Sequence, residues 1–271
     1  KDIKVMTTST EKNHNTSATA ASSGTDLNGA AALMAADQIK ERLLRVAAQI
    51  FANKPGGEDG EYCGEVNTKT LGFKFENGIV TDSKNEISFK ELVSICYFNR
   101  VNLGARGHYK TPGIHFDVEK GKGEPFLYFT NGAACSEVLI DCLTGDTKVL
   151  RTDILMDLGR LINESIDHGQ VAGAFVQSMG WCTTEELNYS SDGKLLSHSP
   201  TTYKIPNIQD TPRVFNIEFL ENNLNAKNVR KSKAVGEPPF LLGLSVWNAI
   251  KSTLLEITKN MPDTGALRLP A

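Results

Sequence analysis

Residues 138–157 read VLIDCLTGDTKVLRTDILMD, and this stretch decides the fold class. Two runs rich in apolar residues, 136–142 and 148–156, flank the turn-forming residues 143–146, so the pattern predicts a hairpin of two core strands. Farther along the chain, apolar and polar residues alternate over 214–220, which predicts another strand with one buried face.

Helical periodicity surrounds these strands. Apolar residues recur every three or four positions from Leu27 to Ile50, which predicts an amphipathic helix with Thr25 or Asp26 as its N-cap. A second helix is predicted from Asn163 through Leu187; its three glycines lower helix propensity and indicate that something packs closely against it. A third helix is predicted to begin near residue 238, where two prolines fit a first turn. Hairpin strands interleaved with long helices predict an α+β, or mixed α/β, domain.

Composition excludes several classes of protein. The 271 residues carry 29 Lys and Arg against 32 Asp and Glu, a net charge of −3, so nucleic acid is not an expected partner. The most apolar stretch, 240–250, is shorter than the roughly 18 residues of a membrane span, so no membrane is expected either. The 5 cysteines lack C-x-x-C spacing and are expected to be reduced thiols in a cytoplasmic protein.

Two local patterns are compatible with ligand binding. The Ser- and Thr-rich stretch 7–25 ends in a loop of small residues that opens onto a helix, where free backbone N–H groups suit an anion, although an ordinary capped helix has the same pattern. Glu237 precedes two prolines that fix its backbone, and both a rigidly held general base and an acid that satisfies a helix N-terminus fit this position. The sequence contains no H-E-x-x-H, G-x-S-x-G or G-x-G-x-x-G motif, which argues against zinc, serine-hydrolase and dinucleotide chemistry.

Four separated stretches make the chain similar to the molybdenum hydroxylases, most closely to the molybdopterin-binding subunit of the xanthine dehydrogenase type. The resemblance covers nearly everything except about residues 53–100. It implies that residues 1–271 are the C-terminal portion of a molybdopterin-binding domain, with a surface excursion at about 53–100. The matching stretches are 15–29 (NTSATAASSGTDLNG), 138–157, 169–187 and 233–239 (KAVGEPP), with shorter matches at 109–112 and 202–206.

The resemblance also implies a site. By position, Ala21 resembles the residue that lines the molybdenum centre, Ser22 and Gly24 resemble pterin contacts, and Gln170 resembles another cofactor contact. Glu237 matches the family's catalytic glutamate, a general base. The metal is held by the dithiolene of the cofactor, so no protein ligand to molybdenum is expected.

The implied reaction is the hydroxylation of xanthine or hypoxanthine, a step of purine catabolism, by a molybdenum-dependent oxidoreductase with water as the oxygen source. FAD and 2Fe-2S clusters are expected elsewhere in the full enzyme, which is expected to be a homodimer. The upstream half of the molybdenum subunit is expected to complete the pocket, so the isolated chain is expected to be inactive. An aldehyde or another N-heterocycle is the alternative substrate, and a non-catalytic docking or assembly module is the alternative of another class.

Overall fold

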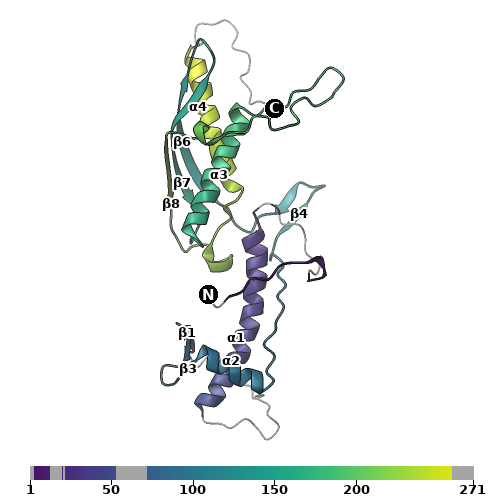
Figure 1. Ribbon diagram of the computed structural model, residues 1–271, viewed down its shortest axis with the longest axis vertical. Coiled ribbons are helices and arrows are strands. Elements are labelled where there is room, and N and C mark those ends of the chain that lie inside the picture. The colour runs from purple at the N-terminus through teal and green to yellow at the C-terminus, as the bar shows by residue number, and fades with distance from the viewer. Residues whose placement is uncertain (1–2, 13–19, 21, 53–71, 258–271) are drawn as a thin grey trace. The chain divides into compact units, whose positions relative to one another are not determined.

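The computed structural model divides into two compact units (Figure 1). The first, which we call the sheet unit, comprises Lys1–Gly24 and Gly113–Ala271, and the second, the helical unit, comprises Thr25–Pro112. Each unit has its own hydrophobic core. The structure describes residues 3–12, 20, 22–52 and 72–257.

The sheet unit is built on the predicted hairpin. Strands β6 (Asn131–Ile140) and β7 (Thr147–Asp157) pair in antiparallel fashion, and Gly145 adopts a positive φ of 77° in the turn between them. Strand β8 (Val214–Phe219) then pairs parallel to β7, giving the order β6-β7-β8. A parallel neighbour requires a crossover connection, which here contains helix α3 (Glu164–Thr183).

Helix α3 begins as the sequence predicts but ends earlier. The side chain of Asn163 accepts a hydrogen bond from the amide of Ile166, which is an N-cap. The helix stops at Thr183 rather than at Leu187. Of its three glycines, Gly180 alone confirms the predicted close packing, because a Cβ there would overlap Glu185 and Pro206.

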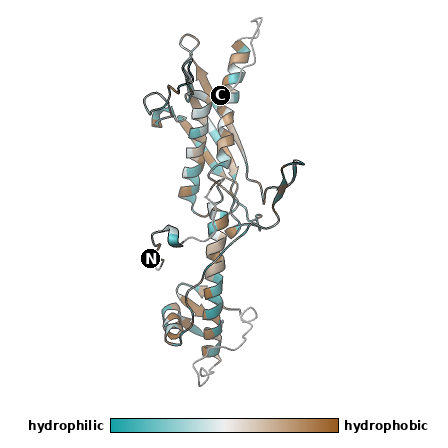
Figure 2. Cartoon of the chain, turned by 90° about the vertical axis from the view of Figure 1, so that its right-hand side faces the viewer, coloured by the Kyte–Doolittle hydropathy of each residue, from teal (hydrophilic) through white to brown (hydrophobic). Residues whose placement is uncertain are grey.

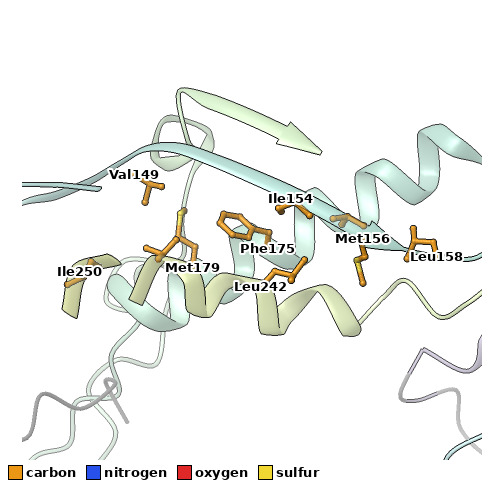
Figure 3. Close-up of a cluster of buried hydrophobic side chains, with 10 residues drawn as sticks. Val149, Ile154, Met156, Leu158, Phe175, Met179, Leu242 and Ile250 are labelled. Atoms are coloured by element: carbon orange, nitrogen blue, oxygen red, sulfur yellow. The ribbon is translucent and has the colours of Figure 1, made fainter. Parts of the chain in front are cut away.

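The last helix of the sheet unit is made of two parts. A 3₁₀ segment, η6 (Pro238–Gly243), starts at the predicted proline and continues into α4 (Leu244–Ile257). Helices α3 and α4 lie on one face of the sheet (Figure 1), where Phe175 fills the centre of the core between Ile154 of β7 and Leu242 of η6 (Figure 3). The predicted mixed α/β class is therefore confirmed. The buried members of this core are Val149, Ile154, Met156, Leu158, Val171, Phe175, Met179, Leu242, Val246 and Ile250.

The continuous helix formed by η6 and α4, Pro238–Ile257, is longer than the apolar stretch 240–250 identified from the sequence. Among the described residues it is the one helix long and apolar enough to cross a membrane by length and composition, with a mean hydropathy of 1.2 over its 18-residue window. Only 22% of that window is buried, and its buried residues Leu242, Val246 and Ile250 belong to the core of the sheet unit.

The helical unit is dominated by α1 (Ala30–Phe51), which carries both hydrophobic and hydrophilic residues (Figure 2) and places Leu43, Val46 and Ala47 in the core of this unit. A π-helical turn, η2 (Thr25–Gly29), precedes it and contains both residues proposed as the N-cap. That capping prediction is wrong, because the chain is already helical at Thr25 and the helix proper follows Gly29.

A small sheet and a second helix complete the helical unit. The predicted Asn77-Gly78 hairpin is confirmed: both residues have positive φ, 51° and 76°, as a type I′ turn requires. The order is β1-β2-β3, and α2 follows with Ser88 as its N-cap. The bounds are β1 Lys74–Glu76, β2 Ile79–Thr81, β3 Glu86–Ser88 and α2 Phe89–Phe98.

The remaining elements are short and belong to the sheet unit. Two strands form a separate antiparallel ribbon, and three are single 3₁₀ turns. They are β4 (His115–Asp117), β5 (Lys122–Glu124), η1 (Thr10–Lys12), η4 (Ile208–Asp210) and η5 (Val229–Lys231).

Candidate functional site

The site within the sheet unit joins two segments that are far apart in the sequence. The backbone amide of Glu237 donates a hydrogen bond of 2.6 Å to the Oγ of Ser22, across 215 positions of the chain. Ser22 has a positive φ of 59° and lies within a tight turn, which is closed by hydrogen bonds from both the amide and the hydroxyl of Ser23 to the carbonyl of Ala20. The conformation of this turn therefore brings the hydroxyl of Ser22 to the segment 236–239.

Gly236 is the point of closest approach. A Cβ placed on Gly236 would lie 2.7 Å from the Oγ of Ser22 and 3.7 Å from the Oε1 of Gln170. Only a residue without a side chain fits such a position without displacing its neighbours. The structure thus brings together three residues predicted from the sequence, namely Ser22, Gln170 and Glu237, although Gln170 lies on a different element, helix α3.

Glu237 occupies the N-cap position of η6, with prolines at the next two positions. Its carbonyl accepts a hydrogen bond of 2.9 Å from the amide of Phe240, but within the described part of the chain its carboxylate makes no capping bond. The side chain is exposed. The backbone is therefore fixed on both sides of an acid that is not engaged in satisfying the helix end.

The two remaining predicted cofactor contacts are Gly24 and Ala21. Gly24 is half-buried, two residues beyond Ser22, and its contact with the pterin stays a prediction. Ala21 lies outside the described residues.

Sequence reasoning missed the residues that anchor the approach to Glu237. Lys233 forms an ion pair with Asp157 at the end of β7, with 2.6 Å between Nζ and Oδ2. Burial raises the pKa of Asp157, but the hydrogen bonds from Lys233, Gly159 and Asn222 outweigh it and leave that pKa below its usual value. Lys233 belongs to a motif used for the resemblance, but its partner lies 76 positions away, so no local signal identified the pair.

The polar groups of the site suit an organic cofactor better than a bare metal ion. They are the hydroxyl of Ser22, the carboxamide of Gln170, the carboxylate of Glu237 and the backbone groups at Gly236, where a side chain would overlap its neighbours. The described residues include no cluster of three or more His, Cys, Asp or Glu able to hold a metal ion. Such a donor set fits molybdopterin, which carries its own ligands to molybdenum and offers hydrogen-bonding groups to the protein.

Comparison with known proteins defines the class. Residues 1–212 match the model of a family described as a molybdopterin cofactor-binding domain, and the chain belongs to that family. Its cofactor class is therefore molybdopterin.

Among its relatives, the xanthine dehydrogenase of Dictyostelium discoideum is 40% identical over 275 residues, which covers 100% of this chain and 18% of that protein. The xanthine dehydrogenase of Oryza sativa subsp. japonica is 42% identical over 259 residues, covering 93% of this chain and 16% of the relative. The chain thus spans less than a fifth of the length of these relatives.

Solved structures confirm the fold. Quinoline 2-oxidoreductase from Pseudomonas putida 86 superimposes with a TM-score of 0.70 at 22% identity, covering 88% of this chain and 28% of that chain. A Cu,Mo-containing CO dehydrogenase gives a TM-score of 0.69 at 21% identity, covering 93% of this chain and 28% of its own.

Proposed function

We propose that residues 1–271 form the C-terminal portion of the molybdopterin-binding domain in a molybdenum enzyme that hydroxylates xanthine or hypoxanthine with oxygen from water. The names of the relatives support the substrate class, because those matching at about 40% identity over the chain are xanthine dehydrogenases. The aldehyde alternative has no comparable support. The observation that carries the proposal is the meeting of Ser22, Gly236 and Gln170 beside Glu237.

In this proposal Glu237 is the general base. The hydrogen bond from its amide to Ser22 and the prolines that follow hold its backbone, so the carboxylate can accept a proton at a defined place. A positioned base of this kind contributes about 10²- to 10⁴-fold to the rate. The cofactor, when bound, would supply the two-electron redox chemistry of the hydroxylation.

Ser22, Gly24 and Gln170 have a different role in the proposal. The Ser22 hydroxyl and the Gln170 carboxamide offer donors and acceptors to the pterin, Gly24 is a further pterin contact, and Ala21 lines the molybdenum centre. The gap at Gly236 keeps these groups within reach of one another. Together they orient the cofactor relative to the carboxylate of Glu237.

The rest of the enzyme supplies what this chain lacks in the proposal. The upstream half of the molybdenum subunit completes the pocket, and FAD and 2Fe-2S clusters in other domains carry electrons away. The full enzyme is a cytoplasmic homodimer in this proposal. The isolated chain has little affinity for molybdopterin and no activity; xanthine oxidation by the isolated chain would contradict this.

The decisive experiment replaces Glu237 by Gln in the full-length protein that contains this chain. Removing the base is expected to lower turnover of xanthine at least about 100-fold, while molybdenum and pterin contents stay normal. Glu218→Gln, which changes an exposed carboxylate on β8, is the matched control. A near-normal rate for the Glu237 variant would instead favour the non-catalytic docking module, and faster turnover of aldehydes than of purines would contradict the substrate.

A further inference from the structure

The segment that leads to Glu237 is anchored by an ion pair shielded from solvent. The side chains of Lys233 and Asp157 are only 12% and 16% exposed. The Asp157 carboxylate also accepts hydrogen bonds from the amide of Gly159 at 2.9 Å and from the side chain of Asn222 at 2.7 Å. The backbone of Lys233 is fixed as well, since its amide donates to the carbonyl of Leu158. The Asp157 carboxylate therefore connects the end of β7 to the segments that contain Asn222 and Lys233.

The chain between Lys233 and Glu237 has little freedom. The amide of Ala234 donates to the hydroxyl of Tyr128 at 3.0 Å, and its carbonyl accepts from Thr130 at 3.3 Å. Val235 packs against the core of the sheet unit. Gly236 then meets Ser22 with no room for a side chain. A shift at Lys233 is therefore passed along four constrained residues to the backbone of Glu237.

A second acid on the same strand provides a contrast. Asp153 pairs with Arg151 and accepts a hydrogen bond from Asn216, so it has a similar number of partners. Its side chain is 41% exposed, however, and its ion pair joins residues two positions apart within β7. The Asp153 pair holds no loop in place, whereas the Asp157 pair connects β7 to the segment that carries the site.

We infer that Lys233, held by Asp157, is a positioning residue that fixes the place of the Glu237 carboxylate. The inference rests on the proposed function of Glu237. Lys233 does not act on the substrate: its charge is matched by that of Asp157, and its effect passes through the backbone of residues 234–237. A displacement of about 1 Å at a reacting group can cost about 10²-fold in rate, so a loosened anchor is expected to slow the reaction.

The test uses the full-length protein loaded with cofactor, with xanthine as substrate. Lys233→Met is expected to lower kcat at least about tenfold and to change KM less than about twofold, with normal molybdenum and pterin contents. The amides of Ala234 and Glu237 are expected to exchange hydrogen faster in this variant. Lys233→Arg keeps the charge and is expected to recover most of kcat. Asp153→Asn is the matched control and is expected to leave kcat and both amides unchanged.

Two results would overturn the inference: an unchanged kcat in Lys233→Met, or unchanged exchange at both amides. If Lys233→Met does not fold, Asp157→Glu replaces it, because the pair is kept but displaced by one methylene; kcat is then expected to fall, and an unchanged kcat overturns the inference. The exchange measurement separates this inference from the proposed function. If Glu237→Gln stays active while Lys233→Met loosens the two amides, the function fails and the anchor stands.

Discussion

The two units of the chain are stabilised by similar cores but differ in how far apart in the sequence their defining contacts lie. In the helical unit, Arg42 of α1 donates to the carbonyls of Asn102 and Gly104 across about 60 positions, and β1, β2 and β3 pair with sequence neighbours. In the sheet unit, the contact that forms the site spans 215 positions. The four described residues of the predicted site all belong to the sheet unit, so packing stabilises both units while the candidate chemistry is confined to one.

Two glycine substitutions, one in each unit, are expected to give the largest difference between the units. Gly236→Val places a side chain against Ser22 and is expected to reduce turnover of the full-length enzyme by about 100-fold or more, because Glu237 is displaced. Gly107→Val in the helical unit would overlap the carbonyl of Ala31 and is expected to lower stability instead. Steady-state kinetics and thermal unfolding of both variants check this. A Gly236 variant that keeps its activity would remove the contrast.

Truncating the two cores is expected to cost comparable amounts of stability. Phe175→Ala in the sheet unit should lower the free energy of unfolding by about 3–5 kcal/mol, and Leu92→Ala in the helical unit by about 2–5 kcal/mol, since both side chains are fully buried. Denaturant unfolding of each variant measures the loss. A loss of unfolding free energy below about 1 kcal/mol at either position would show that the substituted side chain is not part of a packed core.

Cysteine reactivity is expected to report on the helical unit separately. Burial raises the pKa of Cys96 in α2 to about 11, and it raises the pKa of Cys182 in α3 as well. At pH 8 both thiols should resist alkylation by iodoacetamide, while the exposed Cys135 reacts. Leu92→Ala should speed the labelling of Cys96 and leave Cys182 protected, as read by mass spectrometry. Equal acceleration at both thiols would mean that the two units open together.

The smallest expected effect is a dependence of stability on acid pH. The pKa of Asp157 is lower in the folded state than in the unfolded chain, so its contribution to stability is present above the usual carboxyl range and is lost as pH falls through the lowered value. The difference in unfolding midpoint between the wild type and Asp157→Asn should therefore shrink from pH 6 towards pH 3. A difference that grows on acidification would contradict the assigned direction of the pKa change.

Local patterns predicted most of the elements. The apolar runs of β6 and β7, the alternation in β8, the positive-φ turn at Asn77-Gly78 and the Asn163 cap depend on nearby residues, and all are confirmed. The end of α3 was less predictable, because residues 184–187 (TEEL) contain no glycine or proline that would end a helix, although the helix stops at Thr183.

The site was only partly predictable. The resemblance identified Ser22, Gln170 and Glu237. Nothing in their spacing along the sequence showed that they meet around Gly236 in the folded chain. The parallel pairing of β8 with β7 and the ion pair between Asp157 and Lys233 were missed for the same physical reason. Each joins segments through space, and neither leaves a periodic trace in the sequence.

The hydrogen bond between Ser22 and Glu237 also constrains the order of events during biosynthesis. Ser22 is synthesised before Glu237, and 215 further residues must be added before the amide of Glu237 can donate a hydrogen bond to the Oγ of Ser22. Closing so long a loop is entropically unfavourable until β6, β7 and α3 have already folded between its ends. The contact between Ser22 and Glu237 is therefore expected to form late, after the elements between them have folded.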